Sequence, residues 1–405
     1  MNWHVVQLGS RENYAVARAL EKSGLLNQLV TDLWFPTDSL IARGDAESSK
    51  LATRFHFDLK DVSVGCFNYR YVAFEFLQKM LGGSGWDLIM RRNRWFQKQV
   101  VRYLQPRLKP EHILFSYSYT AKAAFQLGKK TGCRLVLGQI DPGVGEEHIV
   151  ANEVAKLPGI ETGFRRAPKP YWDDWREECE LADDIIVNSQ WSQDLLVAEG
   201  IDPAKLHLVP LVYERPEQAS PIAPRDFPTE FSRQRPLRVL FLGQVIPRKG
   251  IHYVIEAARQ LSGRPVRFTI VGDPGPWKTQ LECLENVEVV GRVPRQSVDT
   301  YYQSADVFLF PTLSDGFGLT QLEAQYWGLP LICSKNCGRV VQNDINGVEL
   351  ACVSADAIIK ALELVIQAPA LLEQWSSRSG VCAGMSLHAL GNRLVELSER
   401  RRGSQ

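Results

Sequence analysis

The chain has 405 residues, of which 45% are hydrophobic and 23% are charged. These values are ordinary for globular proteins and exclude a disordered chain, a collagen-like fibre and a coiled-coil rod. The 47 Lys and Arg residues balance 46 Asp and Glu, so the net charge of +1 provides no long-range field for wrapping DNA or RNA. We therefore expect no nucleic-acid partner. At roughly 150 residues per domain, the length predicts two or three domains.

The eight cysteines are scattered through apolar, strand-like runs, and no secretory leader precedes them. We therefore expect reduced core thiols in a cytoplasmic protein rather than disulfides. Cys333 and Cys337 are close in sequence, but no second Cys or His pair stands at zinc-ligand spacing, so we expect no metal site. No apolar run approaches the roughly 18 residues of a membrane span, although the protein could still touch the inner face of a membrane.

Short apolar runs alternate with helix-length segments along the whole chain, which predicts parallel sheets in an α/β protein. The expected strands are 4–8, 28–33, 112–117, 133–140, 184–188, 205–210, 238–242, 266–271, 287–290, 306–310 and 330–334. Residues 213–236 contain five prolines and no apolar period, so they are interpreted as a linker. We expect two doubly wound, Rossmann-like domains that face each other across a cleft, at 1–212 and 237–383, and a last helix in 384–405 that returns to the first domain.

A basic segment lies in the first domain. Within residues 86–110, no acid follows Asp87, and residues 88–105 form an amphipathic helical pattern whose basic face carries Arg91, Arg94, Lys98 and Arg102. One interpretation is attraction to an anionic membrane or to a lipid-diphosphate acceptor. The other is a helix packed on the sheet with a solvated basic face, which fits the core-like apolar stripe better. The two interpretations are compatible if the apolar side of the helix faces the core and its basic side faces the bilayer.

Aromatic residues occur at two further places in this half of the chain. Tyr117 and Tyr119 stand at the carboxyl end of an expected strand, where they could face the cleft and stack on a carbohydrate. Residues 171–175 read Tyr-Trp-Asp-Asp-Trp and predict a helix start that packs aromatic rings between the domains.

At the first strand-to-helix turn of the second domain, residues 243–250 read Gly-Gln-Val-Ile-Pro-Arg-Lys-Gly. The cations Arg248 and Lys249 oppose the dipole of the helix that follows, so their placement makes sense if an anion binds among them. A diphosphate fits that description. A solvated basic turn fits this octapeptide equally well.

A more informative segment, Asp315 to Glu323, follows another expected strand and opens a helix. Gly316 and Gly318 allow the backbone to approach a ligand closely. Glu323 lies about two turns into the helix, where its carboxylate could accept hydrogen bonds from vicinal hydroxyls such as those of ribose. The alternative is an N-capped helix with a surface Glu, which would not need both glycines.

These two segments, together with Gly272, residues 291–293 and residues 306–311, resemble the group 1, or family 4, glycosyltransferases. The resemblance covers roughly residues 237–350, and its parts are ordered and correctly spaced. It implies the GT-B fold, two Rossmann-like domains across a cleft, with the donor site in the second domain and the acceptor on the side of the first.

Carried over by position, the resemblance implies a role for each matching residue. Those expected at the donor diphosphate are Arg248, Lys249, Gly318, Leu319 and, in the first domain, Gly9. Glu323 is expected to hold the ribose, and Arg292 and Val293 to contact the base. Gly316 and Phe317 are expected at the donor sugar, beside Asp315 as a catalytic acid.

The chain departs from the family pattern at three positions. The family usually has Glu at the position of Asp315, often Arg at that of Gln244 and often His near Gln139. In the first domain, Gln139 or Asp141 is a candidate for contacting the donor sugar or the acceptor hydroxyl. Asp141 is the better general base, since it can accept a proton.

The resemblance implies a retaining, hexosyltransferase-type enzyme that uses a nucleoside-diphosphate sugar, with UDP or GDP expected, and a glycan or lipid-linked glycan as acceptor in cell-surface polysaccharide or glycoconjugate synthesis. No Asp-x-Asp motif occurs, so we expect metal-independent transfer and no cofactor. Two alternatives stay open. One is a sugar-nucleotide epimerase or phosphorylase on the same fold. The other, motivated by the three departures, is a nucleotide-binding pseudoenzyme or partner subunit.

Overall fold

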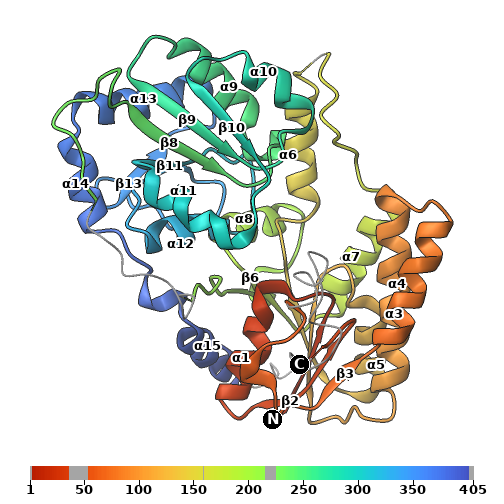
Figure 1. Ribbon diagram of the computed structural model, residues 1–405. Coiled ribbons are helices and arrows are strands. Elements are labelled where there is room, and N and C mark those ends of the chain that lie inside the picture. The colour runs from red at the N-terminus through yellow and green to blue at the C-terminus, as the bar shows by residue number, and fades with distance from the viewer. Residues whose placement is uncertain (1, 36–52, 158, 215–224, 401–405) are drawn as a thin grey trace.

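The computed structural model describes residues 2–35, 53–157, 159–214 and 225–400, which form two α/β units (Figure 1). The expected linker, 213–236, is described only at 213–214 and 225–236, and its prolines 216, 221 and 224 lie outside the described residues. Residues 401–405 of the expected tail lie outside them as well.

The first sheet contains seven parallel strands in the order β3-β2-β1-β4-β5-β6-β7. They are β1 (Trp3–Gln7), β2 (Leu26–Thr31), β3 (Val64–Cys66), β4 (Ile113–Tyr117), β5 (Arg134–Gly138), β6 (Asp184–Val187) and β7 (Leu206–Leu208). Six were predicted. The edge strand β3 was missed because Gly65 interrupts it and Ser63 precedes it, so no continuous apolar run marks it.

Helices cover both faces of this sheet, because successive strand residues point to opposite sides. Val5 of β1 packs in one hydrophobic cluster and Val6 in another. The Val6 side includes residues of α4 (Gly85–Leu104), α5 (Lys122–Thr131) and α7 (Lys169–Leu181), and the Val5 side includes α1 (Ala15–Lys22). The other helices of this unit are α3 (Asn68–Met80), α6 (Val144–Val154) and α8 (Gln190–Ala198).

The second sheet contains six parallel strands in the order β10-β9-β8-β11-β12-β13. They are β8 (Leu237–Leu242), β9 (Val266–Val271), β10 (Val287–Gly291), β11 (Val307–Phe310), β12 (Leu331–Ser334) and β13 (Gly347–Leu350). Its helices are α9 (Ile251–Gln260), α10 (Lys278–Glu282), α11 (Val298–Ser304), α12 (Leu319–Tyr326), α13 (Ala355–Gln367) and α14 (Ala370–Ser377). The edge strand β13 is the one that the sequence did not indicate.

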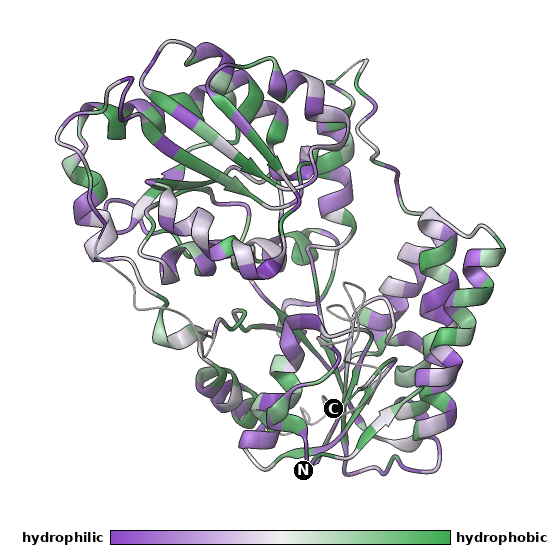
Figure 2. Cartoon of the chain, viewed as in Figure 1, coloured by the Kyte–Doolittle hydropathy of each residue, from purple (hydrophilic) through white to green (hydrophobic). Residues whose placement is uncertain are grey.

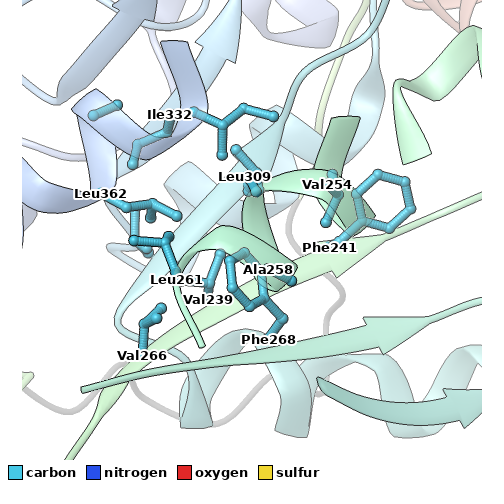
Figure 3. Packing of buried hydrophobic residues seen from close by; sticks show 14 of the residues in the cluster. Val239, Phe241, Val254, Ala258, Leu261, Val266, Phe268, Leu309, Ile332 and Leu362 are labelled. Carbon is cyan, nitrogen blue, oxygen red and sulfur yellow. The ribbon is translucent and has the colours of Figure 1, made fainter. Parts of the chain in front are cut away.

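The core of the second unit lies between this sheet and its helices. Figure 3 shows Val239 and Phe241 of β8 packed with Val254 and Ala258 of α9 and with Leu362 of α13. The strands of both sheets are mostly hydrophobic, whereas the surrounding helices carry polar residues as well (Figure 2). This is the pattern expected when a parallel sheet is covered on both faces.

The last helix, α15 (Leu387–Glu399), packs against α1 of the first unit (Figure 1). The indole N–H of Trp3 donates a hydrogen bond to Ser398 Oγ at 2.9 Å. Arg134 donates to the carbonyl oxygen of Leu397 at 2.8 Å. The chain therefore contributes both of its ends to the first unit.

None of the eight cysteines, all of which lie in the described residues, forms a disulfide. The expectation of core thiols is correct for Cys133, Cys179, Cys333 and Cys337, which are buried. It is wrong for the other four, which are exposed because they lie at strand ends and in turns: Cys66, Cys283, Cys352 and Cys382. Among the described helices, none is both long and apolar enough to cross a bilayer.

Candidate active site

The two units touch at the carboxyl ends of their sheets. On the α8 side, Trp191 Nε1 donates to Ser314 Oγ at 2.9 Å, and Ser192 Oγ donates to the carbonyl oxygen of Gly316 at 3.3 Å. A Cβ atom on Gly316 would lie 2.4 Å from the carbonyl oxygen of Ile140, so this contact requires glycine. The loops that follow β5 and β11 therefore meet at the boundary between the units.

The basic turn, a short 3-10 helix at Pro247–Lys249, follows β8 and leads into α9. Gly250 ends it with a φ of 75°, and a Cβ atom there would lie 2.1 Å from the carbonyl oxygen of Pro311. Only glycine allows this approach. It holds Lys249 beside the loop that carries Asp315.

Lys249, Arg248 and Asp315, expected at the donor from the sequence, form one cluster of charges. Lys249 Nζ pairs with the Asp315 carboxylate, and Arg248 Nη1 lies 3.2 Å from Asp315 Oδ2. Burial alone would raise the pKa of Asp315, but the two cations hold it below its ordinary value. Burial lowers the pKa of Lys249, against the opposing effect of Asp315. The sequence did not indicate that Glu146 belongs to this cluster, with Oε1 3.7 Å from Arg248 Nε.

The loop from Gly316 to Leu319 presents backbone rather than side chains. Gly318 adopts a φ of 85°, and a Cβ atom there would meet the ring of Phe310 at 2.7 Å. Phe317 is buried, and its ring lies directly under Gly338. The expected donor-sugar residues Gly316 and Phe317 are both buried; the N–H of Phe317 donates to Asp315 Oδ1 and its carbonyl oxygen accepts from Gln321 Nε2. The helix α12 begins at Leu319.

Glu323 on α12 is buried, with both carboxylate oxygens engaged. Oε1 accepts a hydrogen bond from Arg295 Nη2 at 2.7 Å, and Oε2 accepts one from the Tyr302 hydroxyl at 2.8 Å. The Arg295 side chain is itself 81% exposed. Arg295 was missed by the sequence analysis, although it stands only three residues after Arg292 in the same loop.

Arg292 and Val293 follow β10. The Arg292 side chain is exposed and pairs with Asp273 at 2.8 Å. Val293 is partly buried and packs against the hydrophobic cluster beneath α12. Both residues therefore lie on the same side of the second sheet as Glu323.

Gly9 lies in the loop after β1. Its N–H donates to Asp32 Oδ1 at 2.9 Å, and Arg54 Nη1 pairs with the same oxygen at 2.9 Å. The three residues from Glu12 to Tyr14 all have positive φ, between 48° and 61°. Such strain persists where the surrounding structure holds the backbone in place, and it clusters at functional sites. Among the described residues, Gly9 contacts Gln7, Asp32 and Arg54 of the first unit, and no hydrogen bond joins it to the charge cluster.

Gln139 and Asp141 lie at the end of β5, and both have structural partners. Gln139 accepts from Trp175 Nε1 at 3.1 Å and donates to the carbonyl oxygen of Asp141 at 2.8 Å. Asp141 Oδ1 accepts from the Tyr119 hydroxyl at 2.5 Å and from the N–H of Gly143 at 2.9 Å. Gln139 is buried, whereas Asp141 is partly exposed and lines a cavity.

This cavity has a volume of about 470 Å³ and lies between the two units. Its first-unit wall contains Asp141, Glu146 and five aromatic side chains, and its second-unit wall is the basic turn at 246–248. The aromatic side chains are Trp86, Tyr119, Phe164, Tyr171 and Trp172. The prediction that residues 171–175 place aromatic rings between the units is therefore correct for Tyr171 and Trp172. Trp175 is instead buried in the first core.

No group of three or more His, Cys, Asp or Glu residues in the described part of the chain is arranged to hold a metal ion. Cys333 and Cys337 are buried, and Cys337 Sγ lies 3.2 Å from the carbonyl oxygen of Ser334. Burial raises the pKa of the Cys337 thiol to about 12, which favours a neutral core side chain.

Residues 224–379 match the family model described as glycosyl transferases group 1. Over these residues the second unit is similar to the group 1 glycosyltransferases. The resemblance inferred from the sequence motifs is thereby confirmed.

The curated relatives include the putative colanic acid biosynthesis glycosyltransferase WcaL of Escherichia coli, 31% identical over 28% of this chain and 32% of the relative. The amylovoran biosynthesis glycosyltransferase AmsK of Erwinia amylovora is 28% identical over 40% of this chain and 42% of the relative. The matched segments span only about a third to a half of the first curated relatives.

Among solved structures, HepE of Anabaena in complex with UDP superposes with a TM-score of 0.62 at 14% identity, covering 98% of this chain and 99% of that one. At this identity the likeness concerns the fold alone. The predicted fold is confirmed: the two α/β units form a GT-B glycosyltransferase fold.

Proposed function

We propose that the protein is a retaining, metal-independent glycosyltransferase that moves a sugar from a nucleoside-diphosphate sugar, with UDP or GDP as the nucleotide, to a glycan or lipid-linked glycan. Its role would lie in cell-surface polysaccharide or glycoconjugate synthesis. The observation that carries this proposal is the charge cluster of Lys249, Arg248 and Asp315, held beside the backbone of Gly318 and Leu319 in a group 1 domain.

The cluster suits the departing diphosphate. Lys249 and Arg248 place two cations beside the N-terminus of α12, where backbone N–H groups and the helix dipole also favour an anion. A preorganised positive site stabilises the charge that develops on the leaving group as the glycosidic bond breaks. This chemistry needs no metal ion, and retention of configuration rests on the resemblance to the family.

Glu323 suits the ribose. A carboxylate that is already held by Arg295 and Tyr302 has its rotamer set before the ligand arrives. Such preorganisation reduces the ordering cost of binding. The remaining acceptor positions on its oxygens can take the two hydroxyls of a ribose, and the loop of Arg292 and Val293 lies on the same side for the base.

Relatives and structural neighbours support the substrate class. HepE was solved with UDP, and WcaL and AmsK are named for colanic acid and amylovoran biosynthesis. The UDP ligand is that of HepE, and the biosynthesis names are those of WcaL and AmsK. For this chain, a nucleotide sugar and a glycan acceptor are our proposal.

The test is a binding panel of UDP-, GDP-, ADP- and TDP-sugars in the presence of a chelator, measured by thermal shift and calorimetry. Wild type is compared with Glu323→Ala and with Glu288→Ala, a matched control at an exposed acid on β10. We expect one nucleotide to stabilise wild type and the control but not Glu323→Ala. If no nucleotide binds at millimolar concentration, the donor-site proposal fails.

Once a donor is found to bind, product assays distinguish a transferase from a phosphorylase, an epimerase and a protein without catalytic activity. A glycosyltransferase needs a glycan acceptor, a phosphorylase needs inorganic phosphate, and an epimerase converts the nucleotide sugar alone. Binding without any of these products would favour a pseudoenzyme or partner subunit.

We also propose peripheral contact with the inner face of an anionic membrane. The four cations of the expected basic face of α4, Arg91, Arg94, Lys98 and Arg102, are all exposed. Beside them α3, whose Phe74 stacks on Trp95 of α4 at 5.1 Å, exposes an apolar stripe at helical spacing, which comprises Tyr69, Val72, Phe76 and Met80. An exposed apolar stripe beside cations on α4 fits anionic lipid.

Sedimentation with vesicles tests the membrane proposal. Wild type should bind vesicles that contain phosphatidylglycerol more strongly than vesicles of phosphatidylcholine alone. Phe76→Ser combined with Met80→Ser should abolish binding, and Ile345→Ser, at an exposed position in the second unit, should not. Equal binding by the double variant would exclude α3 as the contact.

A further inference from the structure

The cavity between the two units is larger than the donor contacts proposed above require. Its volume of about 470 Å³ falls within the range of about 300–1,000 Å³ that is usual for small-ligand sites. It touches the charge cluster only through Arg248 and Glu146. It therefore opens next to the place where the donor sugar would react.

One wall of the cavity is a set of stacked aromatic rings. Tyr119 and Tyr171 stack with centroids 4.7 Å apart and planes at 16°, and Trp86 lies 4.8 Å from Tyr171. All three rings are partly exposed, so they are available to a ligand. Aromatic faces bind the apolar C–H faces of sugar rings through area burial and weak C–H contacts.

This wall is held in a strained backbone conformation. Tyr119 has a φ of 74°, in the left-handed region that favours glycine. Buried Glu178 accepts hydrogen bonds from the N–H groups of Tyr119 at 2.6 Å and Ala121 at 2.7 Å, and the Tyr119 hydroxyl is bonded to Asp141. Hydrogen bonds to the backbone and to the hydroxyl of Tyr119 therefore hold this conformation in place, as is typical of preorganised sites.

The polar lining of the cavity has more carboxyl groups than cations, and burial raises the pKa of one of them, Glu146, to about 8. The lining contains Asp141, Glu146 and Glu147 against Arg165 and Arg248, and Arg248 is already paired with Asp315. Oε2 of Glu146 is buried and makes no hydrogen bond within the described part of the chain. A buried oxygen of this kind suits a hydroxyl or ammonium group of a ligand. An additional carboxylate or phosphate group would lie beside the carboxylates of Asp141 and Glu147, whose like charges disfavour it.

We propose that this cavity binds the acceptor's terminal sugar ring, either uncharged or carrying an amino group, with the ring face on Tyr171 and a hydroxyl or ammonium group hydrogen-bonded to Glu146. The proposal rests on the proposed transferase function and specifies its acceptor. A lipid diphosphate or an acidic sugar, where the acceptor has one, would lie outside the cavity.

The experiment uses the full chain and methyl glycosides of glucose, glucosamine and glucuronic acid as probes. Because Trp86 and Trp172 line the cavity, binding should change the intrinsic tryptophan fluorescence. We expect saturable signals with the first two probes and none with the glucuronide. Equal affinity for the glucuronide, or no response to any probe, would overturn the proposal.

Variants locate the site. Tyr171→Ala and Trp86→Ala should each weaken the glucoside by about tenfold. Glu146→Gln should weaken the amino sugar more than the glucoside. Tyr69→Ala, at an aromatic residue that is 92% exposed on α3, is the matched control and should bind like wild type. Wild-type affinity in both Tyr171→Ala and Trp86→Ala would exclude the aromatic wall.

Nucleotide binding by the same variants separates this proposal from the donor-site proposal. UDP and GDP affinity should be unchanged in Tyr171→Ala. If nucleotides bind but the glycosides do not, the acceptor assignment is wrong and the donor site stands. If neither class of ligand binds, both proposals fail.

Discussion

The indole N–H of Trp191 donates a hydrogen bond to Ser314 Oγ at 2.9 Å, although 123 residues separate the two side chains. The bond joins α8 of the first unit to the residue immediately before Asp315 in the second. The position of the charge cluster is therefore coupled to the packing of the two units on each other.

A double-mutant cycle should measure this coupling. Trp191→Phe keeps most of the ring and removes the N–H, and Ser314→Ala removes the acceptor. We expect a coupling free energy of about 1 kcal/mol in urea unfolding, as for a typical net hydrogen bond. The pair Trp191→Phe with Ser232→Ala, at a serine far along the chain, serves as the control and should be additive. A coupling of zero would mean that the bond does not hold the units together.

Removal of one cation should weaken donor binding. Lys249→Met leaves Asp315 paired with Arg248, so the variant should fold. A charge-assisted bond is worth about 1.5–3 kcal/mol, which predicts about a 10- to 150-fold rise in the Kd of the nucleoside diphosphate by calorimetry. Lys360→Met, at an exposed position on α13, should bind normally. An unchanged Kd in Lys249→Met would place the diphosphate elsewhere.

The role of Glu323 can be tested through the sugar of the nucleotide. If its carboxylate binds ribose hydroxyls, wild type should prefer the ribonucleoside diphosphate over its 2′-deoxy analogue. This preference should shrink by about 1 kcal/mol or more in Glu323→Gln. Arg295→Met should act in the same direction, because Arg295 holds Oε1 of Glu323. Calorimetry with both nucleotides gives the comparison, and an undiminished preference in Glu323→Gln would rule out the ribose contact.

Stability should fall between neutral pH and pH 5 because of His4. Burial, followed by the nearby His112, lowers the pKa of His4 from 6.5 to about 4. Below pH 6.5 the unfolded chain takes up a proton at this position that the folded protein does not, so unfolding becomes easier as the pH falls towards 4. At pH 5 this amounts to about 2 kcal/mol.

Urea unfolding of wild type and His4→Gln at pH 7.5 and pH 5 measures this contribution. The loss of stability between the two pH values should be about 2 kcal/mol smaller in the variant. His388→Gln, at an exposed histidine on α15, should lose as much stability as wild type. An identical loss in His4→Gln would mean that His4 is not the group responsible.

Local sequence determined the elements that carry the donor motifs. The apolar runs predicted both sheets, and Gly316 and Gly318 indicated a backbone that allows close approach, because these signals depend only on neighbouring residues. The edge strands β3 and β13 were missed, since Gly65 interrupts one and Gly347 and Glu349 interrupt the other, so neither shows an apolar run and each is defined by its pairing with a neighbouring strand.

Only the tertiary structure decided which side chains share a site. Glu146 reaches Arg248, Arg295 reaches Glu323, and Trp86 joins Tyr171 because separate helices and loops pack together, and no spacing in the chain records those distances. The same packing directs Gln139 into structural hydrogen bonds. Local backbone preference is a property of a few consecutive residues, whereas a cavity between two units arises from contacts among residues that are distant in the sequence.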